Sequence, residues 1–188
     1  FNRLPLYVLA AFSLHSCVKL EQEPFNELSE HKSFLNIEDA QYWVNGMYDG
    51  LRENTYGNAM YSTDVQADFL NAVRRNNETL PEIHRWSTFT SSNATTAAIW
   101  MAYYKAIQDI NIALKGIPNI PIVQERERVE RAQIQRNLGE LYLGRAYYYT
   151  YLVTHFCGAY DESSAYGLPI VKEFKVTDFP APSSLKET

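Results

Sequence analysis

The chain has 188 residues, of which 46% are hydrophobic and 21% charged, a composition typical of one globular domain rather than of a disordered segment. Its net charge of -5 at pH 7 excludes a domain that binds nucleic acid through bulk electrostatics. Two cysteines cannot form a disulfide framework, and no Cys and His spacing fits a structural zinc site. Because the chain starts at Phe1 and ends just after a Pro/Ser-rich stretch, we expect it to be a fragment of a longer protein.

An uncharged apolar run from Leu4 to Leu14 follows Arg3 near the start of the chain. It is too short to cross a bilayer, which takes about 20 helical residues, and it is typical of the hydrophobic region of a signal peptide. The next residues, Leu-His-Ser-Cys ending at Cys17, resemble the cleavage box of bacterial lipoproteins, with an atypical His in the middle. This resemblance implies that residues 1–16 are a signal peptide without its start, and that Cys17 carries a lipid anchor. The alternative is a buried helix that contains one Cys.

The residues after Cys17 are polar and acidic up to about residue 35, with Glu21, Glu23, Glu27 and Glu30. Such a stretch cannot bury enough apolar surface to fold alone. We therefore expect residues 17–35 to form a tether between the lipid and a folded body.

The folded body begins with an amphipathic helix over about 37–53. Asn36 is the predicted N-cap, and Asp39 completes a capping pattern three residues later. The helix is predicted to end near Asn54 and Gly57. Its apolar face repeats with 3-4 spacing and consists of Ile37, Ala40, Val44, Met47 and Leu51.

Two further helices follow after an irregular stretch. Residues 57–93 are rich in Asn, Ser and Thr and contain Pro81, which predicts mostly loop, with a short helix over about 63–70 as an option. The second helix covers the apolar stripe from Trp100 to Ile117, and the third runs over about 122–157 with Gly158 as its C-cap. Because the second half of the third helix is apolar nearly all round, we expect it to be buried on several sides. The pattern predicts an all-α fold of stacked helix hairpins.

The third helix carries the run GELYLGRAYYY, which ends at Tyr149 and precedes Leu-Val and Phe-Cys-Gly. This run resembles the N-terminal helical signature of the SusD/RagB family. A Trp-x-x-Tyr-Tyr-x-x-Ile pattern from Trp100, which leads to Asn111, and the turn Gly-Leu-Pro-Ile from Gly167 occur in the matching order. Gly144 and Thr150 depart from the family pattern, which has a large apolar residue and an aromatic residue there.

The resemblance implies a TPR-like helical scaffold, of which residues 36–188 are the N-terminal part, truncated at the C-terminus. It further implies a surface-exposed, lipid-anchored protein of the cell outer membrane. Such proteins capture oligosaccharides, or peptides in the RagB branch, for import through a TonB-dependent SusC-like transporter. They are binding proteins rather than enzymes, and we expect no cofactor, no metal and no nucleic-acid partner.

Candidate ligand contacts lie in the 57–93 stretch, since the family places ligand contacts in a comparable loop. Stacking on sugar rings needs aromatic faces, and reading hydroxyl groups needs polar side chains. The candidates of both kinds are Trp86, Arg74, Arg75 and Asn93. The alternative for Trp86 is a core anchor beneath the loop.

Other chemical readings of the sequence are weaker. Asp64 and Asp68 are four residues apart and resemble the acid pair of a glycoside hydrolase or part of a calcium site, but a solvated pair is the simpler interpretation. His155 and Cys157 point apart when they are two residues apart on a helix. Two other function classes remain, a helical-repeat scaffold lipoprotein that binds protein or peptide partners and an all-α enzyme acting on glycans.

The lipid anchor gives the first testable prediction. Replacing Cys17 by Ser removes the thiol that would carry the lipid, so the variant should leave the membrane fraction of expressing cells. Cell fractionation followed by immunoblotting measures this. A variant that stays in the membrane fraction as the parent does would show that the anchor lies elsewhere.

Overall fold

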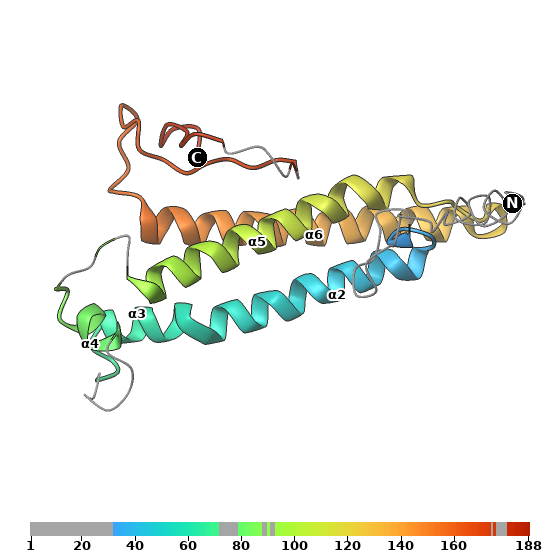
Figure 1. Cartoon of the computed structure of the whole chain (residues 1–188). Helices are drawn as coiled ribbons and strands as arrows, with labels where there is room; N and C mark the ends of the chain where they lie inside the picture. Colours follow the sequence, from blue (N-terminus) through green and yellow to red (C-terminus); the bar gives the residue numbers. More distant parts are fainter. Residues whose placement is uncertain (1–31, 72–78, 88–89, 91–92, 174, 176–179) are drawn as a thin grey trace, which may run out of the picture.

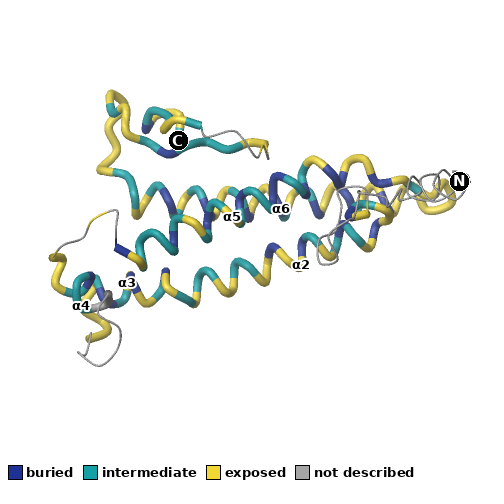
Figure 2. Tube along the Cα trace, in the orientation of Figure 1, coloured by how far each residue is buried: buried dark blue, intermediate teal, exposed yellow. Residues whose placement is uncertain are grey.

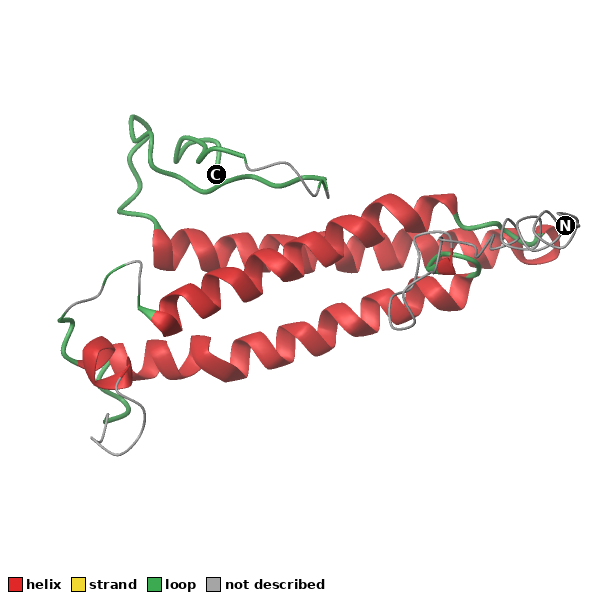
Figure 3. Ribbon diagram, in the orientation of Figure 1, coloured by secondary structure: helices red, strands yellow, loops and turns green. Residues whose placement is uncertain are grey.

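The computed structural model describes residues 32–71, 79–87, 90, 93–173, 175 and 180–188. These residues form α2 (Ile37–Asn54), the π turn η2 (Thr55–Ala59), α3 (Met60–Gln66), α4 (Thr79–His84) and α5 (Ala94–Gly116). Two short 3-10 turns, η3 (Ile117–Asn119) and η4 (Gln124–Arg126), lead into α6 (Glu127–Phe156). The described part of the chain contains helices and loops but no strand (Figure 3), which confirms the all-α prediction.

The three long helices α2, α5 and α6 lie alongside one another, and each contacts the other two (Figure 1). Buried and exposed residues alternate along them, as Figure 2 shows, so each helix turns one stripe toward the shared core. The core is aliphatic with two aromatic rings, and its most deeply buried members include Val44, Tyr103, Ile107, Leu141, Tyr148 and Leu152. None of the helices in the described ranges has the length and apolarity needed to span a bilayer.

The start of α2 confirms the predicted capping pattern. Asn36 Oδ1 accepts a hydrogen bond from the Asp39 amide at 3.0 Å, and Asp39 Oδ2 accepts one from the Asn36 amide at 3.1 Å. Within the expected tether, Ser33 and Phe34 pack against the body: the Ser33 carbonyl accepts from Trp43 Nε1, and the Phe34 ring stacks on Trp43. The expected signal peptide and Cys17 lie outside the described residues.

The predicted end of α2 near Asn54 is confirmed, since α2 spans Ile37–Asn54, but the chain stays helical beyond it through η2 into α3. Gly57 leaves the helical conformation, with φ -92° and ψ -132°, and this produces a kink rather than a stop. The prediction of mostly loop over 57–93 therefore fails at 57–66 and again at α4. The optional short helix is real, but it spans Met60–Gln66 rather than 63–70.

Tyrosines of α6 hold this kinked segment in place. Asn54 Nδ2 donates to the Tyr148 hydroxyl at 3.3 Å, and the Tyr151 hydroxyl donates to the Ala59 carbonyl at 3.4 Å. The Tyr147 and Thr55 hydroxyls lie 3.1 Å apart. Burial raises the pKa of the Tyr148 and Tyr151 hydroxyls, so both remain protonated and uncharged at neutral pH. The π turn is thus fixed by contacts more than 90 residues away in sequence.

α5 is longer than its apolar stripe, and the end of α6 differs from expectation. α5 begins at Ala94, six residues before the stripe that starts at Trp100, because Asn93 caps it. α6 ends with Cys157 as an extended C-cap, and the described glycines all have negative φ, so the predicted Gly158 C-cap is wrong. α6 is buried along one stripe only, since Tyr142 and Leu143 on another face are exposed.

Gly144, which departs from the family pattern, lets α6 approach α2 closely. A Cβ atom built at this position would lie 2.6 Å from Met47 Sδ and 3.1 Å from Met47 Cγ. Gly144 is itself buried, so a side chain there has no free space to enter. The helix-propensity cost of the glycine, about 1 kcal/mol, is therefore offset by the packing of α2 on α6.

The segment after α6 returns along α5 and α6 and is held there by a polar clamp. We define the clamp as Asn111, Arg145 and Tyr149 with the backbone of Val171. Asn111 Nδ2 donates to the Val171 carbonyl at 2.8 Å, and Arg145 Nη1 donates to Asn111 Oδ1 at 2.7 Å. The Tyr149 hydroxyl accepts from the Val171 amide at 2.7 Å and lies 3.2 Å from the Val171 carbonyl. Nearby, the Tyr104 hydroxyl donates to the Pro169 carbonyl at 3.0 Å.

The close approach at Gly144 predicts opposite results for two substitutions on the same helix. Gly144→Leu should lower the free energy of unfolding by about 1–3 kcal/mol, because the side chain overpacks against Met47. Gly139→Leu is the control, since a Cβ at Gly139 meets no atom within 4 Å. It should be neutral or raise stability by up to about 1 kcal/mol through helix propensity. Urea unfolding measures both, and equal effects would contradict this account of Gly144.

The clamp predicts a large cost for a small change at Asn111. Asn111→Ala leaves the Val171 carbonyl and the Arg145 guanidinium without their partner and should cost about 1–3 kcal/mol of unfolding free energy. Asn119 is the control because it is exposed and its side chain donates to the Lys115 carbonyl four residues earlier. Asn119→Ala should stay within about 0.5 kcal/mol of the parent. Equal effects in thermal and urea unfolding would refute a stabilising role for the clamp.

Candidate functional site

α3 and α4 form a helical tip, defined as residues 60–71 and 79–87, at the end of the bundle where α5 begins (Figure 1). The two short helices pack on each other, and their C-terminal ends lie together. His84 Nδ1 of α4 lies 3.4 Å from the Val65 carbonyl and 3.9 Å from Asp68 Oδ1, both at the end of α3. The Tyr147, Tyr148 and Tyr151 contacts described above fix η2, from which the tip extends.

Trp86 projects from the end of α4. The Trp86 amide donates to the Ile83 carbonyl at 3.2 Å and the Ser87 amide to the Glu82 carbonyl at 3.2 Å, the two bonds of a Schellman motif. Trp86 occupies the left-handed position of this motif, with φ 52°, where glycine is usual and a bulky residue is strained by about 1–2 kcal/mol. Its side chain is 67% exposed, so Trp86 is not a core anchor within the described structure.

The other predicted ligand contacts are Arg74, Arg75 and Asn93. Arg74 and Arg75 lie outside the described residues. Asn93 is buried at the start of α5, where its Oδ1 accepts from the Thr95 and Thr96 amides and its Nδ2 donates to Glu82 Oε2 at 3.3 Å. Asn93 therefore caps α5 and joins it to α4, a role that its position directly before a helix could have indicated.

The weaker catalytic and metal candidates are placed as follows. Asp68 is exposed, and its carboxylate Oδ1 lies 3.9 Å from His84 Nδ1. His155 stacks on the Tyr151 ring with centroids 3.8 Å apart, and burial raises the pKa of the Cys157 thiol. Within the described ranges, no group of three or more His, Cys, Asp or Glu residues is arranged to hold a metal ion.

The sequence analysis did not name Phe69, which lies three residues after the last residue of α3. Its side chain is 82% exposed. The sequence analysis singled out Asp64 and Asp68 in this segment. An aromatic residue just after a short polar helix is itself a signal of an exposed contact residue.

A groove of about 250 Å³ separates α2 from α5 on the bundle itself. It is open because small residues face each other one turn apart, Gly46 and Gly50 on α2 with Ala102 and Ala106 on α5. Leu141 and Tyr148 of α6 line it as well, and its polar side chains are Glu53, Asn54, Lys105 and Asp109.

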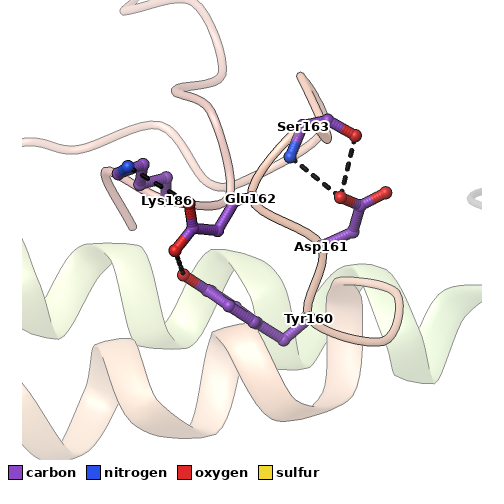
Figure 4. Close-up of polar contacts among 5 residues, drawn as sticks. All are labelled: Tyr160, Asp161, Glu162, Ser163 and Lys186. Carbon is purple, nitrogen blue, oxygen red and sulfur yellow. Dashed lines mark hydrogen bonds and ion pairs between the residues drawn. The ribbon is translucent and has the colours of Figure 1, made fainter.

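The C-terminal segment forms an ordered turn beside α6 (Figure 4). Asp161 Oδ1 accepts from the Ser163 amide and hydroxyl, both at 2.8 Å, and these bonds lower the pKa of the Asp161 carboxyl. Lys186 pairs with Glu162 at 3.2 Å and so ties the last residues to this turn. A second cavity, of about 610 Å³, lies where the segment meets α5 and is lined mainly by charged and polar residues such as Lys172, Glu173, Lys175 and Glu187.

The chain resembles known proteins along most of its length. A family model described as SusD-like, "Starch-binding associating with outer membrane", matches residues 20–183. The SusD-like protein P38 of Formosa agariphila is 27% identical over 146 residues. That match covers 77% of this chain but 27% of the relative, so the chain spans about a quarter of the relative's length. No solved structure matches the chain.

Asn111, Arg145 and Tyr149 of the clamp, and Tyr147 and Tyr148 beside η2, belong to the motifs that first indicated this family, and the family model covers all of them. The chain therefore belongs to the SusD-like family of starch-binding proteins that associate with the outer membrane.

Proposed function

We propose that this chain is part of a carbohydrate-binding protein associated with the outer membrane, and that its helical tip contacts the carbohydrate. Family membership supports the ligand class. The observation that carries the assignment of the tip is Trp86, which is exposed although its backbone conformation is strained. Strain of this kind persists where the surrounding structure imposes it, and it clusters at binding sites.

The chemistry of Trp86 suits a sugar ligand. The flat face of an indole packs against the apolar C–H face of a pyranose ring, and the indole N–H donates to a hydroxyl group. The Schellman motif fixes the backbone at Trp86, so little conformational entropy is lost when the ring is covered. We propose that Arg74 and Arg75, which lie in the same 57–93 stretch as Trp86, donate hydrogen bonds to sugar hydroxyl groups.

The wider setting of this function is also a proposal. We infer that Cys17 carries a lipid that anchors the protein at the cell surface, on the support of the Leu-His-Ser-Cys sequence. We further infer that the protein delivers its ligand to a SusC-like TonB-dependent transporter for import, as the family resemblance implies.

We propose binding without cleavage. Glycoside hydrolysis needs two carboxyl groups placed on either side of the scissile bond. At the tip, the Asp68 carboxylate lies 3.9 Å from His84 Nδ1, and Asp64 contributes its backbone carbonyl to the end of α3. These contacts suit a structural role for both residues.

Binding of a protein or peptide partner is the second candidate function. The exposed side chains of Val129, Tyr142 and Leu143 on α6 favour it, because large apolar side chains in contact with water suit a protein partner. The resemblance to the RagB branch of the family implies a peptide as the alternative ligand.

The role of Trp86 can be tested in the full-length protein. A glycan array identifies the oligosaccharides that bind, and titration calorimetry then compares the parent with Trp86→Ala. We expect the variant to bind about 5- to 150-fold more weakly, the equivalent of 1–3 kcal/mol, while its circular dichroism stays unchanged.

Tyr42→Ala is the matched control, since Tyr42 is an exposed aromatic residue of α2 away from the tip. It should leave the affinity unchanged. Unaltered binding by Trp86→Ala would remove the tip from the site, and release of shortened sugars from the array would overturn binding without cleavage.

A further inference from the structure

The Tyr103 hydroxyl is buried in the core of the bundle and has no hydrogen-bond partner among the described residues. Tyr103 lies on the first half of α5 and is 1% exposed. Most buried polar groups in folded proteins have a partner, and a group left without one costs free energy. A phenylalanine would fill nearly the same volume without that cost, so the packing of the ring does not explain the hydroxyl.

The surroundings of Tyr103 are polar as well as aromatic. The centroid of its ring lies 5.0 Å from that of Tyr148 and 4.7 Å from that of Tyr151, both on α6. Burial raises the pKa of the Tyr103 hydroxyl, and the neighbouring hydroxyls of Tyr151, Tyr147 and Tyr148 raise that pKa further. We call these four residues the tyrosine cluster. The Tyr103 oxygen thus lies within electrostatic range of three other tyrosine oxygens.

Two members of the tyrosine cluster have hydrogen-bonding capacity left. A tyrosine hydroxyl donates one bond and accepts others. The Tyr148 hydroxyl accepts from Asn54 Nδ2, and this bond leaves its own proton available for a second one. The Tyr151 hydroxyl donates to the Ala59 carbonyl at 3.4 Å, well beyond the usual O–H···O distance of about 2.7–2.8 Å. A small polar molecule beside these hydroxyls would therefore find both donors and acceptors.

The backbone next to the tyrosine cluster is interrupted. α5 contacts η2, and Gly57 leaves the helical conformation inside η2. Where the ladder of helical hydrogen bonds is broken, backbone carbonyls take their partners from side chains or from water. The Ala59 carbonyl, for example, accepts from the Thr63 hydroxyl at 2.9 Å as well as from Tyr151. Polar side chains and irregular backbone thus meet at one place in the core.

The groove between α2 and α5 reaches the tyrosine cluster. Gly50, Asn54 and Tyr148 are among the residues that line it. A Cβ atom built at Gly50 would lie 3.7 Å from the Tyr148 hydroxyl oxygen, so no side chain of Gly50 covers that oxygen. The groove therefore gives a short path by which a water molecule exchanges between solvent and the cluster.

We propose that the Tyr103 hydroxyl binds one internal water molecule, which also contacts the hydroxyls of Tyr148 and Tyr151. Buried waters in proteins make about three hydrogen bonds, and these three hydroxyls supply that number. The water joins α5 to the two α6 tyrosines that hold the residues around η2. Because α3 extends from η2, the water helps to fix the position from which the tip begins. This inference is independent of what the tip binds.

The test is Tyr103→Phe in the full-length protein, because this change removes the hydroxyl and keeps the ring. If the hydroxyl binds a bridging water, the loss of these bonds should lower Tm by about 2–4 °C. If the hydroxyl is buried without a partner, its removal should raise Tm instead. Scanning calorimetry measures the shift, and a Tm that rises or stays the same refutes the water site.

Tyr42→Phe is the matched control, since it removes the same atom from a ring that is 70% exposed on α2. Its Tm should equal that of the parent. Hydrogen exchange followed by mass spectrometry tests the link to η2. In Tyr103→Phe, amides of residues 55–66 should exchange at least about threefold faster, while residues 127–140 of α6 should exchange as in the parent. Equal acceleration of both segments would refute a local role at η2.

A high-resolution crystal structure of the full-length protein identifies the partner of the hydroxyl directly. We expect a water oxygen within hydrogen-bond distance of the Tyr103 oxygen in the parent, and its loss in Tyr103→Phe. A direct bond from Tyr103 to a protein group would refute the water site even if Tm falls.

Discussion

The buried amide of Asn111 joins three parts of the chain. It lies on α5, accepts from Arg145 of α6, and donates to the carbonyl of Val171 in the segment that follows α6. An amide at 3% exposure is costly unless its polar atoms are paired, and here both Oδ1 and Nδ2 are. The register of α5 on α6 and the path of the C-terminal segment are therefore coupled.

The same helix α6 that carries Arg145 also controls the tip. Tyr147, Tyr148 and Tyr151 contact Thr55, Asn54 and Ala59, which frame the π turn and the kink at Gly57. α3 leaves this kink and packs on α4, which carries Trp86. Trp86 is thus positioned by a chain of contacts that starts in the core, although the residue itself is exposed. A rigid scaffold with an exposed end favours binding, because less conformational entropy is lost when the ligand binds.

Sequence patterns predicted the elements that local chemistry determines. The capping box at Asn36 and Asp39 is confirmed because both of its hydrogen bonds lie within one helical turn. The stripe from Trp100 predicted the body of α5, but not its true start, because Asn93 was interpreted as a ligand contact rather than as an N-cap. The kink at Gly57 was missed since its partners on α6 are distant in sequence. The tip was predicted only in part: the sequence indicated Trp86 as a contact and a short helix near α3, but not α4 or the left-handed conformation of Trp86, which contradicts its local preference.

Gly144 and Trp86 both contradict local conformational preferences, but for different physical reasons. Gly144 lowers helix propensity, yet Met47 fills the space that its missing side chain leaves, so the core itself explains the departure. Trp86 is strained and exposed, and no contact among the described residues compensates it. The motif residues that indicate the family, such as Asn111, Arg145 and Tyr149, hold backbone atoms in place. If ligand recognition differs between members of such a family, it follows that the differences should lie at exposed ends such as the tip. There, side chains change without disturbing the clamp.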